Sequence, residues 1–190
     1  MNRLLLFILL SFSSELVSSQ PVKENKRIGL NLPFFITSAG VGDYDEQYLF
    51  NPQIGIRKNK SMYYVGPSIS LHSGFTGGIF SYQIFPNGTG NRFDFFFQAN
   101  VCYETTKYND YNGFYWGDNT TRETKSSLLI GYGFHLNTGD QFFITTNFGF
   151  GICSQTRKIV YNNSNYNRNL SEIKPGVEIS LGIGFNFRKH

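Results

Sequence analysis

The feature that most constrains this chain is the alternation of two kinds of side chain along eight segments. From Arg92 to Glu104, every second residue beginning with Phe93 is aromatic or aliphatic, whereas those between are mostly polar. Strict alternation places the two sets on opposite faces of a β-strand. The other segments begin near Ile28, Tyr48, Tyr63, Phe80, Leu128, Phe142 and Val177. The sequence therefore predicts eight strands and an all-β fold.

The connectors between these segments alternate in length. Most of one group are tight turns, and the other group is longer and rich in Asn, Tyr and Gly. Short turns on one side and long loops on the other are typical of membrane barrels. We expect the long connectors to be solvated loops. The tight turns are Arg57–Ser61, Pro86–Asn91 and Asn137–Asp140, and the long connectors are Thr37–Gln47, Thr106–Arg122 and Gln155–Glu172.

The polar set of residues separates a membrane barrel from the alternative fold, a secreted lipocalin-like barrel. A soluble barrel would expose a face rich in Lys, Glu and Thr. Here the polar set is small, as in Ser180, Gly182, Gly184 and Asn186, which suits a narrow lumen. The bulky apolar face then contacts lipid, since no helix in the sequence could cover it. The prediction is an eight-stranded antiparallel up-and-down transmembrane β-barrel.

The N-terminal residues have the pattern of a secretory signal peptide. Arg3 precedes an apolar run from Leu4 to Leu10, and small residues end the segment before Gln20. The run is too short to cross a membrane as a helix. The expected divisions are a signal peptide at 1–19, a periplasmic segment at 20–26 and one barrel domain at 27–190.

With these features the chain resembles the small eight-stranded outer-membrane β-barrels of Gram-negative bacteria, such as the OmpA membrane domain and OmpX. The resemblance rests on the signal peptide, the strand count, the loop asymmetry and the last strand, VEISLGIGFNF. It implies that Phe187 is the terminal aromatic that the barrel-assembly machinery recognises. It also implies a monomer in the cell outer membrane, in contact with membrane lipids and lipopolysaccharide. The net charge of +4 mildly favours contact with anionic lipid headgroups or polyanions.

Charged residues inside the strands belong to the polar set. Asp94, Glu104, Glu178 and Arg57 are therefore expected to face the lumen as a polar network. Pairing among them is expected, because an unpaired buried charge is costly.

Three further residues of the polar set carry expectations. Cys102 and Cys153 lie on strands separated by one other strand, hence about 9–10 Å apart at a strand spacing of about 4.8 Å. A disulfide requires a shorter distance, so we expect two free thiols. Phe96 is a large aromatic in a narrow lumen, and we expect a glycine opposite it to make room.

No motif indicates catalysis, a metal or another cofactor. His72 and His135 both fall in the luminal set but toward opposite ends, and Ser73 points away from His72 because adjacent strand residues face opposite sides. We therefore expect no enzyme, no cofactor, no metal and no nucleic-acid partner.

The leading functional hypothesis is a structural or surface-interaction role through the extracellular loops. Phe114, Tyr115 and Trp116 are the candidate contacts with an extracellular ligand, because exposed aromatics supply binding area. A packed lumen argues against a general porin. Two alternatives stay open: a narrow ion or small-solute channel past Glu104 and Glu178, and a lipid A-modifying enzyme.

Overall fold

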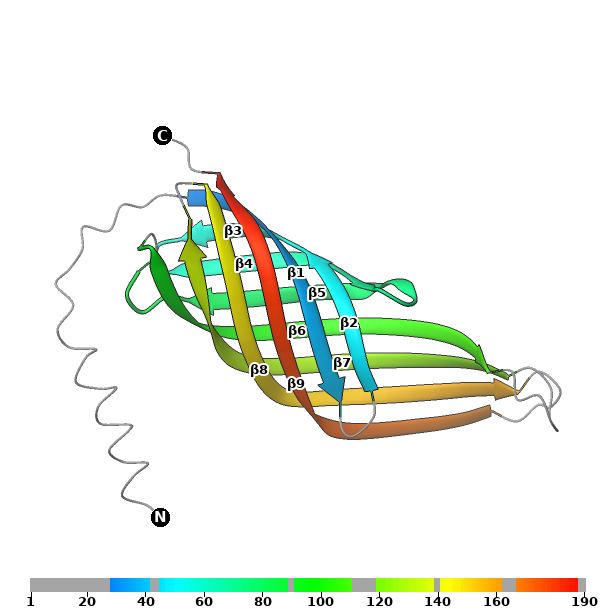
Figure 1. Ribbon diagram of the computed structural model, residues 1–190. Helices are drawn as coiled ribbons and strands as arrows, with labels where there is room; N and C mark the ends of the chain where they lie inside the picture. The colour runs from blue at the N-terminus through cyan, green and yellow to red at the C-terminus, as the bar shows by residue number, and fades with distance from the viewer. Residues whose placement is uncertain are drawn as a thin grey trace, which may run out of the picture.

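Nine strands form one closed antiparallel sheet in the computed structural model, which describes residues 28–41, 45–88, 91–110, 119–138, 141–161 and 167–187 (Figure 1). The strands are β1 (Ile28–Val41), β2 (Asp45–Pro52), β3 (Ile54–Lys58), β4 (Ser61–Ser70), β5 (Gly74–Ile84), β6 (Phe93–Asp110), β7 (Asn119–Asn137), β8 (Phe142–Tyr161) and β9 (Asn167–Phe187). Among these residues no helix is long and apolar enough to cross a membrane.

β2 and β3 are two parts of one barrel strand, since both pair with β1 on one side and with β4 on the other. Every other strand pairs with its neighbour in sequence, and β1 closes the sheet against β9. The result is an eight-stranded up-and-down barrel, which confirms the predicted fold class. The interruption falls at Gln53, directly after Pro52, which has no N–H to donate. The Gln53 N–H instead donates to the Pro33 carbonyl at 2.8 Å.

The two faces of the strands have the predicted orientation. On β9, Ile179 and Leu181 are 57% and 62% exposed, whereas Ser180 and Gly182, which alternate with them, are buried. A soluble barrel would bury the apolar set, so the lipocalin-like alternative is wrong and the exposed apolar face suits lipid. We name this exposed surface on β6–β9 the apolar belt; it includes Phe93, Phe97, Val101, Leu128, Ile130, Tyr132, Phe150, Ile152, Ile179, Leu181 and Ile183.

Four strands continue well past the rest of the barrel. β5 pairs with β6 only as far as Gly77 opposite Glu104, and β1 pairs with β9 only as far as Val41 opposite Gly176. β6–β9 run on, paired with one another, as a curved four-stranded sheet (Figure 1). We name residues 105–110, 119–125, 154–161 and 167–174 the extension.

The extension corrects the expectation that Thr106–Arg122 and Gln155–Glu172 are solvated loops. The ladder from β6 to β7 reaches Asp110 opposite Asn119, and the ladder from β8 to β9 reaches Val160 opposite Asn167. Backbone hydrogen bonds continue from the barrel wall into these segments, so they stay extended although their side chains are polar.

Candidate functional site

Aromatic side chains fill the lumen at the end that carries the tight turns. Phe96 is 0% exposed, and its ring centroid lies 4.8 Å from that of His135. The His135 ring also stacks on Phe143 at 4.8 Å and lies 5.2 Å from the ring of Phe85. We name Tyr64, Phe85, Phe96, His135 and Phe143 the aromatic plug; all five side chains are buried.

Glycines on the neighbouring strands make room for the plug. Phe96 lies opposite Gly133, where a Cβ atom would overlap the Phe96 ring. Phe143 lies opposite Gly184, where a Cβ atom would overlap the Phe143 ring in the same way. The expectation of a glycine opposite Phe96 is confirmed.

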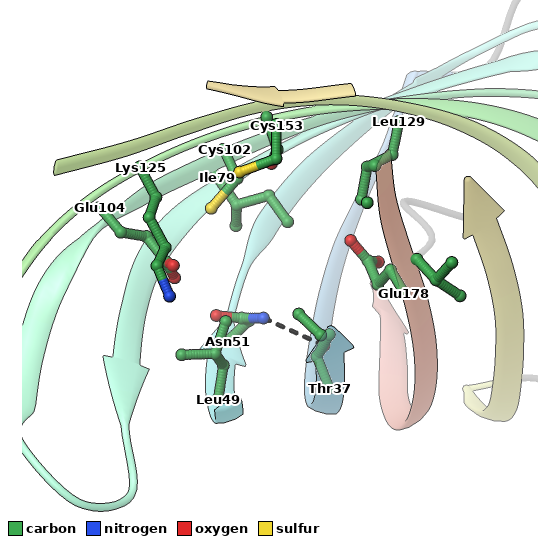
Figure 2. A pocket seen from close by; sticks show the side chains of 14 residues that line it. Thr37, Leu49, Asn51, Ile79, Cys102, Glu104, Lys125, Leu129, Cys153 and Glu178 are labelled. Carbon is green, nitrogen blue, oxygen red and sulfur yellow. Dashed lines mark hydrogen bonds between the residues drawn. The ribbon is translucent and has the colours of Figure 1, made fainter. Parts of the chain in front are cut away.

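A cavity of about 40 Å³ lies in the lumen between the plug and the extension (Figure 2). Its wall includes Glu104 and Lys125, whose side chains lie close together, and Glu178, which lies on the opposite side of the cavity. A second space of about 10 Å³ shares Thr37, Ile79 and Glu178 with the first. Because one water needs about 10–15 Å³, these two spaces have room for a few water-sized molecules.

Neutral groups donate the hydrogen bonds that hold the two carboxylates of this cavity. Glu104, 8% exposed, accepts from the Ser68 hydroxyl at 2.5 Å. Glu178, 4% exposed, accepts from the Asn100 amide at 2.9 Å and from the Ser180 hydroxyl at 3.1 Å. Serine and asparagine at neighbouring inward positions reach these oxygens, and a hydrogen-bonded carboxylate is tolerable in a buried site.

The other two residues of the expected luminal network lie nearer the plug. Asp94 is buried and accepts hydrogen bonds from the side chains of Asn91 and Asn137 at 2.9 and 3.0 Å. Arg57 is half-buried on β3, opposite Met62. The four charged residues therefore occupy two levels of the lumen, with only Glu104 and Glu178 at the cavity.

The two cysteines line the same cavity on alternate strands. Cys102 lies opposite Ser127, which in turn lies opposite Cys153. Both thiols are free, as the strand spacing predicted.

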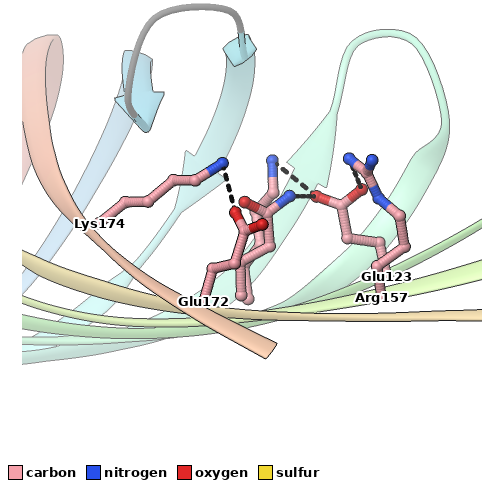
Figure 3. Close-up of polar contacts among 6 residues, drawn as sticks. Glu123, Arg157, Glu172 and Lys174 are labelled. Atoms are coloured by element: carbon pink, nitrogen blue, oxygen red, sulfur yellow. Dashed lines mark hydrogen bonds and ion pairs between the residues drawn. The ribbon is translucent and has the colours of Figure 1, made fainter. Parts of the chain in front are cut away.

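The inward face of the extension carries an ion-pair cluster that the sequence analysis missed. Glu123 is buried and contacts Lys125 at 3.1 Å, Arg157 at 3.3 Å and the Gln155 amide at 2.6 Å (Figure 3). Assigning these segments to loops hid the cluster, because only strand pairing brings Glu123 and Arg157 opposite each other.

A second ion pair lies on the same face of the extension. The Lys174 ammonium donates to Glu172 at 2.8 Å, and this hydrogen bond lowers the pKa of the Glu172 carboxyl (Figure 3). Glu172, Lys174 and Arg157 also line a hollow of about 110 Å³. This hollow is small and formed mostly by charged side chains.

The remaining candidate residues divide as follows. Phe114, Tyr115 and Trp116 lie outside the described residues. Phe187 is the last residue of β9, opposite Leu30 and facing outward. His72 is exposed in the turn between β4 and β5, which corrects its assignment to the lumen: the strand ends at Ser70, whose hydroxyl accepts from the His72 N–H at 3.2 Å.

No family model and no curated protein sequence matches the chain. Among solved structures, the outer membrane protein AlkL, determined in DMPC bilayers, matches with a TM-score of 0.52 and 9% identity over 90% of this chain and 95% of AlkL. The N-terminal barrel domain of Pseudomonas aeruginosa OprF matches with a TM-score of 0.48 and 12% identity over 84% and 97%. Neisserial surface protein A gives 0.26 and 10% over 85% and 97%.

The AlkL match, at this identity, establishes the fold alone. Together with the closed sheet and the apolar belt, it shows that the chain has the fold of a small eight-stranded outer-membrane β-barrel.

Proposed function

We propose that this protein resides in the cell outer membrane and presents the extension at the cell surface as a binding platform. Export by a signal peptide at residues 1–19 and assembly through Phe187 belong to this proposal. So does an orientation with the tight turns in the periplasm. The observation that carries it is the regular pairing of β6–β9 beyond the apolar belt, with polar side chains on both faces.

The edges of the extension support a role in binding. Beyond Glu104, β6 has no strand neighbour on its β5 side, and β9 has none on its β1 side before Gly176 among the described residues. Such edges present backbone donors and acceptors to an extended partner segment. Phe114, Tyr115 and Trp116 belong to the segment that joins β6 to β7 at the far end of the extension, and we propose them as additional contacts.

Shortening both hairpins tests the platform. Asn-Gly turns would join Thr105 to Thr124 and Thr156 to Ser171, which are cross-strand pairs. The barrel should still fold, since the apolar belt and the plug are intact, and its gel mobility should still change on heating. A membrane-impermeant, lysine-reactive crosslinker applied to intact cells should capture partners of the full-length protein only.

A matched variant isolates the aromatic contacts. Replacing Phe114, Tyr115 and Trp116 with serine leaves the extension in place and should lose a subset of the crosslinked partners. Unchanged crosslinking after both hairpins are shortened would contradict the platform.

A narrow channel is the second candidate, and the polar cavity beside Glu104 and Glu178 favours it. The plug opposes it, because packed rings fill the lumen on the side of the tight turns. We expect no steady conductance from the native barrel in planar bilayers. Phe96→Ala with Phe143→Ala should produce discrete openings, since both rings leave the lumen.

The control for this variant is Phe95→Ala with Phe97→Ala, which removes two rings from the lipid-facing side of β6. Each buried Phe→Ala change costs about 3–5 kcal/mol, so the folded fraction is measured first by unheated gel mobility. Equal conductance in the native protein and the plug variant would show that the plug is not the barrier.

We propose that the protein is not an enzyme. His135 is packed among the rings of the plug, and His72 lies in an exposed turn, so neither is placed like a catalytic base beside a nucleophile. Overexpression should leave lipid A unmodified, as mass spectrometry of extracted lipid would show.

A further inference from the structure

With distance from the apolar belt, the outward face of β6–β9 changes from apolar to hydroxyl-bearing and then to positively charged side chains. The last fully apolar row across β6–β9 is Val101, Leu128, Ile152 and Pro175. One mixed row follows, and the outward row after that consists of Thr105, Thr124, Thr156 and Ser171. We name it the hydroxyl row. The next row places Lys107 opposite Arg122 and Arg122 opposite Lys158; we name these three the cation row.

The cation row lacks an internal counter-charge. Like charges directly opposite each other on a sheet repel. The extension's two carboxylates whose side chains the structure describes, Glu123 and Glu172, point to the other face, where Lys125, Arg157 and Lys174 accompany them (Figure 3). All three side chains of the cation row are exposed. The row therefore forms a patch of three positive charges that an external anion would stabilise.

The position of the row fits the headgroup layer of a membrane. Tyr103, 54% exposed, is the last apolar outward residue of β6, and Lys107 follows it on the same face. Four residues span about 13 Å along a strand, or about 10 Å of height at a barrel tilt of 35–45°. Long Lys and Arg side chains can bend back toward the membrane, which brings their charges into the headgroup region about 5–8 Å thick.

We propose that the outward face of the extension binds a phosphorylated glycolipid of the surrounding leaflet, the lipid A part of lipopolysaccharide. The apolar belt contacts its acyl chains, the hydroxyl row contacts its sugar hydroxyls, and the cation row holds its phosphates. Arg122, flanked by both lysines, is placed to bind a phosphate bidentately. The inference rests on the proposed location of the extension at the outer surface.

The test removes the cation row from the full-length protein. Lys107→Gln, Arg122→Gln and Lys158→Gln are combined, and diphosphorylated lipid A is titrated into protein refolded in zwitterionic detergent. Binding is read from the rise in the temperature at which the folded gel band is lost. We expect lipid A to raise this temperature for the native protein. The variant should need about 100-fold more lipid A for the same rise, since each basic residue near an anionic lipid surface contributes about a factor of five to the affinity.

A control variant carries the same charge change at the other end of the barrel. Lys58→Gln, Lys60→Gln and Arg92→Gln alter exposed residues at the tight turns and should leave the lipid-induced shift unchanged. Dephosphorylated lipid A and inorganic phosphate should each give no shift, and phosphatidylglycerol a smaller one. An equal shift in the cation-row variant, or from any of these three compounds, would overturn the assignment.

Failure of this inference is separable from failure of the proposed function. Proteinase added to intact cells reports whether the extension is at the surface, independently of any lipid measurement. A cleaved extension combined with no lipid A shift would refute the glycolipid site alone. An uncleaved extension would refute the surface platform, whatever the shift in detergent.

Discussion

Leu181→Arg is expected to lower the stability of the folded barrel in a lipid bilayer by about 2–4 kcal/mol. Leu181 lies near the middle of the outward apolar residues of β9 and is 62% exposed in the protein alone. In a bilayer this exposed surface is in hydrocarbon, where a guanidinium loses its hydration. Urea unfolding in phospholipid vesicles, followed by unheated gel mobility, measures the change.

Ser171→Arg is the matched control, because Ser171 lies on the same face of the same strand but in the extension. It should leave the free energy of unfolding unchanged within about 0.5 kcal/mol, as surface substitutions usually do. If both variants had the same stability, the apolar belt would not be in contact with lipid.

The fold was predictable because the alternation of apolar and polar residues can be read within each strand, without knowing how the strands pair. The stretch around Phe95 and Phe97 gives the outward face, and the small residues of the last segment give the lumen. Even the fit of Phe96 could be anticipated, since a large residue in a narrow barrel requires a small one beside it. The identity of that small residue, Gly133, needed the register.

The extension was not predictable by the same argument. In the run Thr120–Lys125 both faces are polar, so no hydrophobic period marks a strand. The segment is extended because its backbone pairs with β6 and β8, and hairpins that begin in the barrel wall continue that pairing outward. The ion pair between Glu123 and Arg157 and the row formed by Lys107 and Arg122 both depend on that pairing.

In the lumen, too, the sequence predicted which residues face inward but not which of them contact one another. The sequence placed Glu104 and Glu178 inside, and the structure buries both. Their hydrogen-bond donors, Ser68 for one and Asn100 and Ser180 for the other, come mainly from other strands. Which neutral group reaches a carboxylate is set by inter-strand register and barrel curvature, and neither is encoded in a local pattern.

Gly131→Ala and Gly149→Ala are expected to have opposite effects, although the two glycines lie directly opposite each other on β7 and β8. A Cβ atom at Gly131 would overlap the Phe148 carbonyl oxygen and approach the Gly149 Cα atom, both of which are backbone. Backbone cannot give way as a side chain can, so the strands must separate. We expect a loss of about 3 kcal/mol or more, at the upper end of overpacking effects.

At Gly149 the nearest atoms to an added Cβ are the Leu129 Cβ at 3.5 Å and the Gln98 Nε2 at 3.7 Å, which are ordinary contacts. Neither glycine has a positive φ, so alanine can adopt both backbone conformations. Gly149→Ala should therefore be neutral or stabilise the barrel by up to about 1 kcal/mol, because alanine restricts the unfolded chain. Urea midpoints of the two variants in the same vesicles decide the point. Equal destabilisation by both would mean that the close approach of β7 and β8 at Gly131 is not what limits side-chain size in this wall.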